Sequence, residues 1–214
     1  MQPMILHKRS KALLILASSV WLLGSGCATS RGILPIEVAT QSNPDTGQTF
    51  RIVEVKDSRV FELRPPQPST PSLENGEIQD ESITLRAIAR KRNGYGKALG
   101  DILLPEGRTV LDLTRESITR AMRESGLRVL TEADPGWNAA TALQADIQQL
   151  WAWITPGFWT LALDFDMRVR ITTDLGSFRE GQEAHGAIRL HSQTAGTRAW
   201  SNTIPKGSRS SIEI

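Results

Sequence analysis

Hydrophobic and polar residues alternate along much of the second half of the chain. The clearest case is residues 159–171, where every second position is apolar and most positions between are polar or charged. The apolar positions are Trp159, Leu161, Leu163, Phe165, Met167, Val169 and Ile171. A period of two predicts a long strand with one buried face and one face toward water, as in antiparallel sheets.

Shorter segments repeat this pattern. Residues 50–56 and 83–89 alternate before the helical region, and residues 186–190 alternate near the C-terminus. Residues 143–153 form a less regular case, whose expected inward positions are Leu143, Ala145, Ile147, Trp151 and Trp153. Each of these segments is predicted to be a strand.

One segment of the chain has helical periodicity. Residues 109–125 place Leu111, Ile118 and Met122 on one stripe, and Gly126 follows as a stop signal. Strands before and after a single helix indicate an α+β fold. We therefore expect a curved antiparallel sheet of about five to six strands, with this one main amphipathic helix packed on one face.

Two stretches lack either period. Residues 27–48 contain polar, turn-forming positions and are expected to form a tether, and residues 64–80 hold four prolines and are expected to form a long loop. The predicted organisation is therefore a cleaved segment 1–26, the tether 27–48 and a single domain 49–214.

The first 27 residues have the features of an export signal. Lys8, Arg9 and Lys11 precede an uncharged run from Ala12 to Leu23, which is shorter than the roughly 20 residues that span a bilayer. Small residues then lead to Cys27, the only cysteine. The alternatives are a plain secretory signal with a chance cysteine, or a buried Cys27 in an uncleaved chain.

The segment from Leu22 to Cys27 resembles the lipobox at which bacterial lipoprotein precursors are acylated and cut. Gly24 stands where the motif usually has leucine. The resemblance implies lipidation of Cys27 and attachment to a membrane through acyl chains without a spanning helix. Ala28 after the cysteine implies sorting to the outer membrane, facing the periplasm.

Composition narrows the function classes. A single cysteine excludes an internal disulfide framework and any multi-cysteine metal site. After removal of residues 1–26, which contain three basic residues and no acids, 22 basic residues face 23 acids. A net charge of −1 gives no global field for nucleic acid, so no nucleic-acid partner is expected.

Three short motifs resemble the YajG-type family of bacterial periplasmic lipoproteins and, more loosely, the auxiliary lipoproteins of envelope transport systems. They lie at residues 53–59, 125–130 and 143–150. The resemblance supplies no catalytic residues and no cofactor. In that family a C-terminal amphipathic helix is common, whereas residues 200–214 here have no helical stripe.

The polar residues give little sign of catalysis. On an extended strand His185 and His191 lie about 20 Å apart, too far to share a metal, so no metal site is expected. Asp164 and Asp166 share a strand face and could form an acid–base pair, but arginines continue that face, which favours a solvated surface. Ser58 lacks the motif of a nucleophile elbow, so Asp57 is expected to form a turn at the end of the strand and to pair with Arg59.

A glycine-rich basic loop is a candidate for contact with an anion or lipid headgroup. The residues concerned are Lys91, Arg92, Gly94, Gly96 and Lys97. The loop lacks the end of a phosphate-binding P-loop, and the alternative is a flexible connection.

An aromatic hairpin is the most informative segment. The turn chemistry of residues 155–158 brings together Trp151, Trp153, Phe158 and Trp159. These side chains either close one end of the core or form an exposed patch for an envelope protein, peptidoglycan or lipid.

The expected function is that of an outer-membrane-anchored, periplasm-facing lipoprotein that supports or binds another envelope component without catalysis. One alternative is an auxiliary of envelope transport that binds a lipid or another hydrophobic ligand in a cavity lined by Met122, Phe165 and Met167. The other is an envelope enzyme that uses Asp164 or Asp166.

Overall fold

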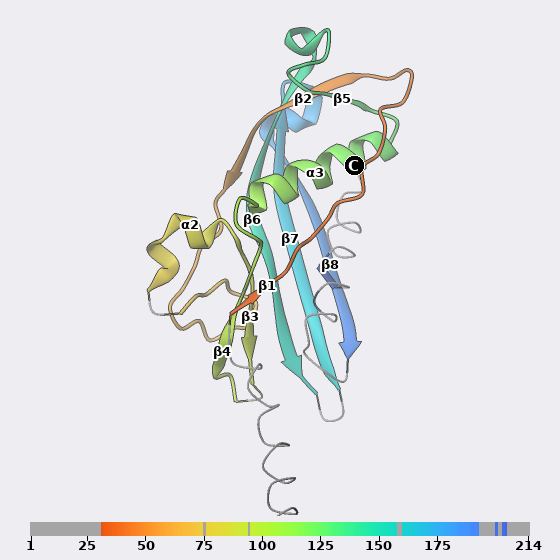
Figure 1. Cartoon of the computed structure of the whole chain (residues 1–214). Coiled ribbons are helices and arrows are strands. Elements are labelled where there is room, and N and C mark those ends of the chain that lie inside the picture. Colours follow the sequence, from red (N-terminus) through yellow and green to blue (C-terminus); the bar gives the residue numbers. More distant parts are fainter. Residues whose placement is uncertain are drawn as a thin grey trace, which may run out of the picture. The chain divides into compact units, whose positions relative to one another are not determined.

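The computed structural model describes residues 31–214 apart from 75, 94, 158–159, 193–199, 201–202 and 205–214; the side chains of 156 and 177 are not described either. The described residues belong to one compact unit, Arg31–Ile214. The expected signal segment and Cys27 lie outside the described residues. Figure 1 shows the arrangement of the elements.

The described chain forms an eight-stranded sheet with two α-helices, which confirms the α+β class. The strands are β1 (Gly32–Ile33), β2 (Thr49–Asp57), β3 (Ala87–Arg92), β4 (Ala98–Leu103), β5 (Arg128–Leu130), β6 (Thr141–Pro156), β7 (Leu161–Thr173) and β8 (Gln182–Ser192). The helices are α2 (Glu81–Thr84) and α3 (Val110–Glu124), with 3₁₀ turns at Glu77–Gln79, Trp137–Ala139 and Gly176–Glu180.

The sheet is larger than expected and mixed in direction. β6, β7 and β8 form an antiparallel meander, and β3 and β4 form an antiparallel hairpin. Parallel pairs join β1 to β4, β2 to β5 and β6, and β3 to β6. The expectation of five to six antiparallel strands was therefore wrong, because β1 has only two residues and β4 follows directly on the glycine-rich loop, so neither strand shows a period in the sequence.

The long strand β6 organises the sheet. From Leu143 to Pro156 it pairs with β7 on one edge. On the other edge its first half, Thr141–Ile147, pairs with β2, and Ala152 near its end pairs with β3. Two strands thus share one edge of β6, and a junction lies between them, where β2 leaves and β3 joins (Figure 1).

A β-bulge in β6 reverses which side chains face the helix. Before it, Ala145 and Ile147 pair with Ile171 and Val169; the register shifts between Ile147 and Gln149. One extra residue moves every later side chain to the opposite face. After the bulge the positions paired with Met167, Phe165 and Leu163 are Leu150, Ala152 and Ile154.

The predicted inward stripe of residues 143–153 was therefore correct only up to Ile147. Trp151 and Trp153 lie opposite Asp166 and Asp164, on the other face of the sheet. There Trp151 packs in a second buried cluster with Leu73, Ala87 and Leu103. The surrounding residues of this cluster are Phe61, Ile78, Ile83 and Trp153.

Helix α3 covers the first face, as expected from residues 109–125. Thr109 and Asp112 form a capping box: the Thr109 N–H donates to the Asp112 carboxylate at 2.9 Å, and the Asp112 N–H donates to the Thr109 hydroxyl at 3.3 Å. Gly126 ends the helix with φ +83°. The buried residues of α3 are Val110, Leu113, Thr114, Ser117, Ile118 and Met122.

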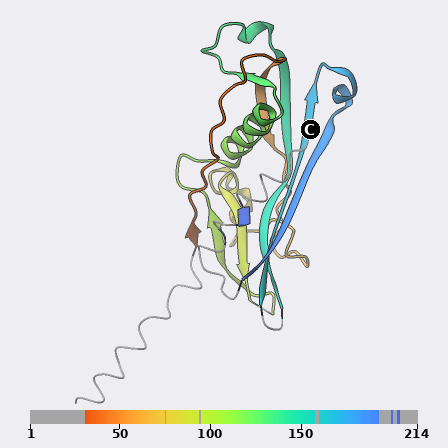
Figure 2. The same cartoon turned by 90° about the vertical axis from the view of Figure 1, so that its right-hand side faces the viewer.

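The two stretches without periodicity pack on the sheet and helix. Over its described part the expected tether buries Leu34 and Ile36 in the main core, and the Leu34 N–H donates to Leu103 O at 2.9 Å. In Figure 2 this segment runs along the outer side of α3. The Pro-rich loop buries Leu73, and its Ser69 carbonyl accepts from the Gln149 amide at 2.8 Å. Hydrophobic burial, rather than local periodicity, places both.

The C-terminal stretch also contributes to the core. Trp200 and Ile204 are buried in the main cluster, although residues 200–214 have no helical stripe. These two side chains therefore help to fill the main core from the C-terminal end of the described chain.

Candidate functional site

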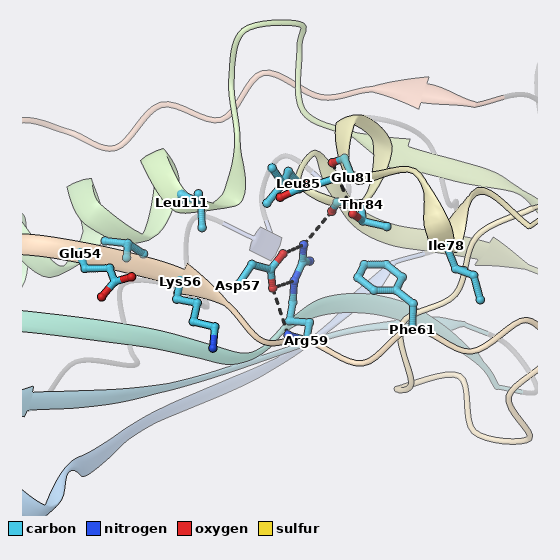
Figure 3. A pocket seen from close by; sticks show the side chains of 11 residues that line it. Glu54, Lys56, Asp57, Arg59, Phe61, Ile78, Glu81, Thr84, Leu85 and Leu111 are labelled. Carbon is cyan, nitrogen blue, oxygen red and sulfur yellow. Dashed lines mark hydrogen bonds and ion pairs between the residues drawn. The ribbon is translucent and has the colours of Figure 1, made fainter.

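A polar cleft of about 440 Å³ opens at the junction where β2 leaves β6 (Figure 3). β2 supplies Glu54, Lys56 and Asp57, and α2 supplies Glu81 and Thr84. The other lining residues are Val55, Arg59, Phe61, Ile78, Leu85 and Leu111. The cleft is the direct result of two strands sharing one edge of β6.

Arg59 fills the floor of this junction with a fully buried guanidinium group. Its Nε donates to Asp57 Oδ1 at 2.8 Å and its Nη2 to Asp57 Oδ2 at 2.7 Å. The remaining donors reach three backbone carbonyls, namely Ala87 O at 2.7 Å, Leu150 O at 3.0 Å and Thr84 O at 2.8 Å. A guanidinium has five N–H donors, and five bonds account for them.

The Arg59 bonds give this group a structural role. The carbonyls belong to β3, β6 and the end of α2, so one side chain joins the elements that meet at the junction. Asp57 thus pairs with Arg59 at the end of the first strand, as the sequence indicated. Since all five donors are engaged, Arg59 has none left for a ligand in the cleft.

An apolar cavity of about 380 Å³ lies at the other end of the sheet, beneath the end of α3. Met122 lines it from α3, and Phe178 and Leu175 line it from the connection between β7 and β8. The remaining lining residues are Gln48, Phe50, Leu127, Leu143, Ile171, Thr173 and Gly176.

This cavity is near the one expected between helix and sheet, but its walls differ. Met122 is part of it, whereas Phe165 and Met167 are buried in the main core and do not line it. The sequence did not identify the contribution of Phe178, because that residue lies in a 3₁₀ turn without periodicity. Apolar walls with few polar groups suit a hydrophobic ligand.

The two candidate carboxylates are engaged with neighbours across the strands. Asp164 accepts the Thr155 hydroxyl at 2.6 Å and bonds to Arg189, and this bond raises the pKa of the Arg189 guanidinium. Asp166 bonds to His185 at 2.8 Å and lies 3.6 Å from Arg168. Cross-strand pairs of this kind stabilise a sheet and leave less freedom for acid–base work.

The histidines lie on β8, as the sequence indicated. His185 pairs with Arg168 in register and His191 with Ala162, so the two rings are well separated along the strand. Among the described residues, no group of three or more His, Cys, Asp and Glu side chains could hold a metal ion.

The predicted glycine-rich basic loop is partly strand: Lys91 and Arg92 end β3, and Gly96 and Lys97 lie in the turn that leads to β4. Asn93 organises it, because its side-chain oxygen accepts from the backbone N–H groups of Tyr95 and Lys97, both at 3.0 Å. The Gly96 N–H donates to the Asn93 carbonyl. These N–H groups are therefore engaged within the turn. Arg92 donates to the Ser72 hydroxyl at 3.0 Å, and Gly94 lies outside the described residues.

The aromatic hairpin does not expose its first two tryptophans. Trp151 is fully buried, with the Phe61 ring edge-on at 5.9 Å, and Trp153 packs beside it. Phe158 and Trp159 lie outside the described residues. β6 runs to Pro156 and β7 begins at Leu161, so the turn falls later than the expected residues 155–158.

No family model and no curated protein matches the chain. One solved structure, titled "Crystal structure of uncharacterized protein", is similar over 85% of this chain and 92% of that chain, with a TM-score of 0.39 and 10% sequence identity. None of the described helices is long and apolar enough to cross a membrane.

Proposed function

We propose that the chain is a lipoprotein held in the outer membrane by acyl groups on Cys27, and that its periplasm-facing domain supports or binds another envelope component without catalysis. The observation that carries this proposal is the sequence of the first 27 residues. A basic start, a short apolar run and small residues before a solitary cysteine occur together there. Several buried acyl chains, at about 0.8 kcal/mol per CH₂, anchor a protein stably.

The chemistry of the described domain is compatible with a binding role. The carboxylates that could serve an acid–base reaction are engaged by Thr155, Arg189 and His185. Arg59, the buried cation at the floor of the polar cleft, donates all its hydrogen bonds to backbone carbonyls and to Asp57. These groups stabilise the fold, and the cavities between them are the places where a partner or ligand could bind.

The anchor is tested by replacing Cys27 with serine. We expect the C27S protein to leave the membrane fraction or to keep its signal segment, because serine cannot form the thioether on which acylation depends. Fractionation and the apparent mass of the protein in its native host measure this. Serine at position 25 offers a matched control, since Ser25→Ala leaves the thiol in place and should keep membrane attachment. Unchanged processing and fractionation of C27S would count against the anchor.

The second candidate function is the binding of a lipid or another hydrophobic ligand, and the apolar cavity beneath α3 favours it. Its volume of about 380 Å³ falls within the range of small-molecule sites, and Met122 contributes an adaptable wall.

Filling this cavity should weaken binding of a hydrophobic probe. Met122 lines the cavity, and a larger side chain there takes up part of its volume, so we expect Met122→Trp to reduce the fluorescence of bound 1-anilinonaphthalene-8-sulfonate about tenfold. Leu63→Trp, at an exposed site outside the cavity, serves as the control and should leave the signal unchanged. Equal probe binding by both variants and the parent would contradict a ligand role for the cavity.

A further inference from the structure

A third cleft, distinct from the two above, is lined by arginines and has a volume of about 440 Å³. It lies between α3, β2 and the segment that leaves β5. Arg115, Thr119 and Arg123 line it from α3, at a spacing of four residues that places them along one side of the helix. The other lining residues are Arg51, Ile52, Val53, Val129, Leu130, Thr131, Glu132 and Trp137.

The three arginines that line the cleft are Arg51, Arg115 and Arg123. None of them forms an ion pair with a carboxylate among the described residues. Arg123 donates to Asn43 Oδ1 at 2.9 Å, Gln41 O at 2.7 Å and Val129 O at 2.9 Å, and these acceptors are neutral. Arg115 donates to Ile52 O at 2.7 Å. Two nearby arginines do have carboxylate partners: Arg108, just before α3, pairs with Glu116, and Arg120, within α3, pairs with Glu124.

Neutral acceptors hold the guanidinium groups in place without cancelling their charge. Arg51 lies over the ring of Trp137, with its guanidinium carbon 5.6 Å from the ring centroid, and a ring face orients a cation in the same way. The Arg51 Nε is buried and has no hydrogen-bond partner. A buried donor without an acceptor costs free energy, so an acceptor that reaches this atom would stabilise the site.

The charge of the cleft matches a doubly negative ligand. Glu132 is the one acid among the lining residues, so three arginines leave a net charge of +2. Asp134 lies close by, but its carboxylate accepts the Thr131 N–H at 2.6 Å and the Thr131 hydroxyl at 2.7 Å. These bonds, together with the charges of Arg123 and Arg128, lower the pKa of Asp134.

We propose that this cleft between α3, β2 and the end of β5 binds a phosphate group through Arg51 and Arg115, with Arg123 adding positive charge. Guanidinium groups bind tetrahedral oxyanions from several directions, and a phosphate monoester has oxygens enough for all of them. The phosphate belongs either to a free phosphate compound or to the headgroup of a lipid. This inference does not depend on acylation of Cys27.

The test measures binding of two soluble probes to the full chain in detergent micelles by calorimetry: inorganic phosphate and dihexanoyl phosphatidic acid. We expect saturable binding of at least one probe, weakened about tenfold by Arg51→Gln and by Arg115→Gln. Arg115 is exposed, so its variant retains the fold even if Arg51→Gln does not. Arg120→Gln removes the same charge from the same helix at a position outside the cleft, and it should bind as the parent does.

The relative affinity of the probes identifies the source of the phosphate. Tighter binding of the short-chain lipid assigns the cleft to a headgroup, and equal binding of inorganic phosphate assigns it to a free compound. Absence of saturable binding overturns the proposal. So does equal binding by the two cleft variants and the parent, or an equal loss in Arg120→Gln, since either result would mean that the three-arginine cleft is not the site.

Discussion

Replacement of Arg59 by alanine is expected to lower the free energy of unfolding by about 3–5 kcal/mol. The change leaves the Asp57 carboxylate without its buried partner, and it leaves carbonyls of Thr84, Ala87 and Leu150 without their donor. Unpaired buried acceptors and an uncompensated charge are among the costliest changes in a protein interior. Urea unfolding of the full chain, followed by tryptophan fluorescence, measures the loss.

Two further variants separate the role of Arg59 from a general effect of charge. Arg168→Ala removes an arginine whose side chain is 45% exposed, and it should change stability by less than about 0.5 kcal/mol. Arg59→Lys keeps the charge but cannot supply five donors in a planar fork, so most of the loss should remain. An Arg59→Ala protein as stable as Arg168→Ala would show that the junction does not depend on this side chain.

Replacement of Trp151 by alanine should cost about 3–5 kcal/mol, because the indole is fully buried between Leu73, Ala87 and Leu103. The same urea titration measures it. Tyr95→Ala, at a site that is 98% exposed, is the aromatic control and should be nearly neutral. If Trp151→Ala were equally neutral, Trp151 would belong to a surface patch rather than to the second cluster.

A smaller aromatic substitution adds a sharper test of the Trp151 environment. The Trp151 Nε1 is buried without a hydrogen-bond partner. Trp151→Phe removes that unpaired donor together with some packing volume. It should therefore cost much less than Trp151→Ala, by a difference of at least about 1 kcal/mol in the unfolding titration.

The sequence predicted most elements whose period is regular. Residues 83–89 are an exception, because helix α2 occupies Glu81–Thr84 and strand β3 begins only at Ala87. Helix α3 and the strand from Leu161 to Ile171 follow from spacing alone, and the cap at Thr109 and the stop at Gly126 agree with local chemistry. Residues 143–153 failed at one point, because a β-bulge after Ile147 adds a residue and reverses the face of everything that follows. No local signal in the sequence marks that bulge.

The sites were harder to predict than the strands. Arg59 was recognised as a partner of Asp57, but its three carbonyl acceptors come from segments 25 to 91 residues away in the chain. The apolar cavity and the arginine cleft likewise join residues from distant elements. Spacing within a segment reports which face a residue shares, and tertiary packing decides what stands opposite that face.

The mass of the mature protein extracted from membranes tests the lipid anchor most directly. We expect a chain that begins at Cys27 and whose mass exceeds that of its amino acids by the mass of the attached acyl groups. A mature chain with a bare thiol at Cys27, or one that still carries residues 1–26, would contradict it.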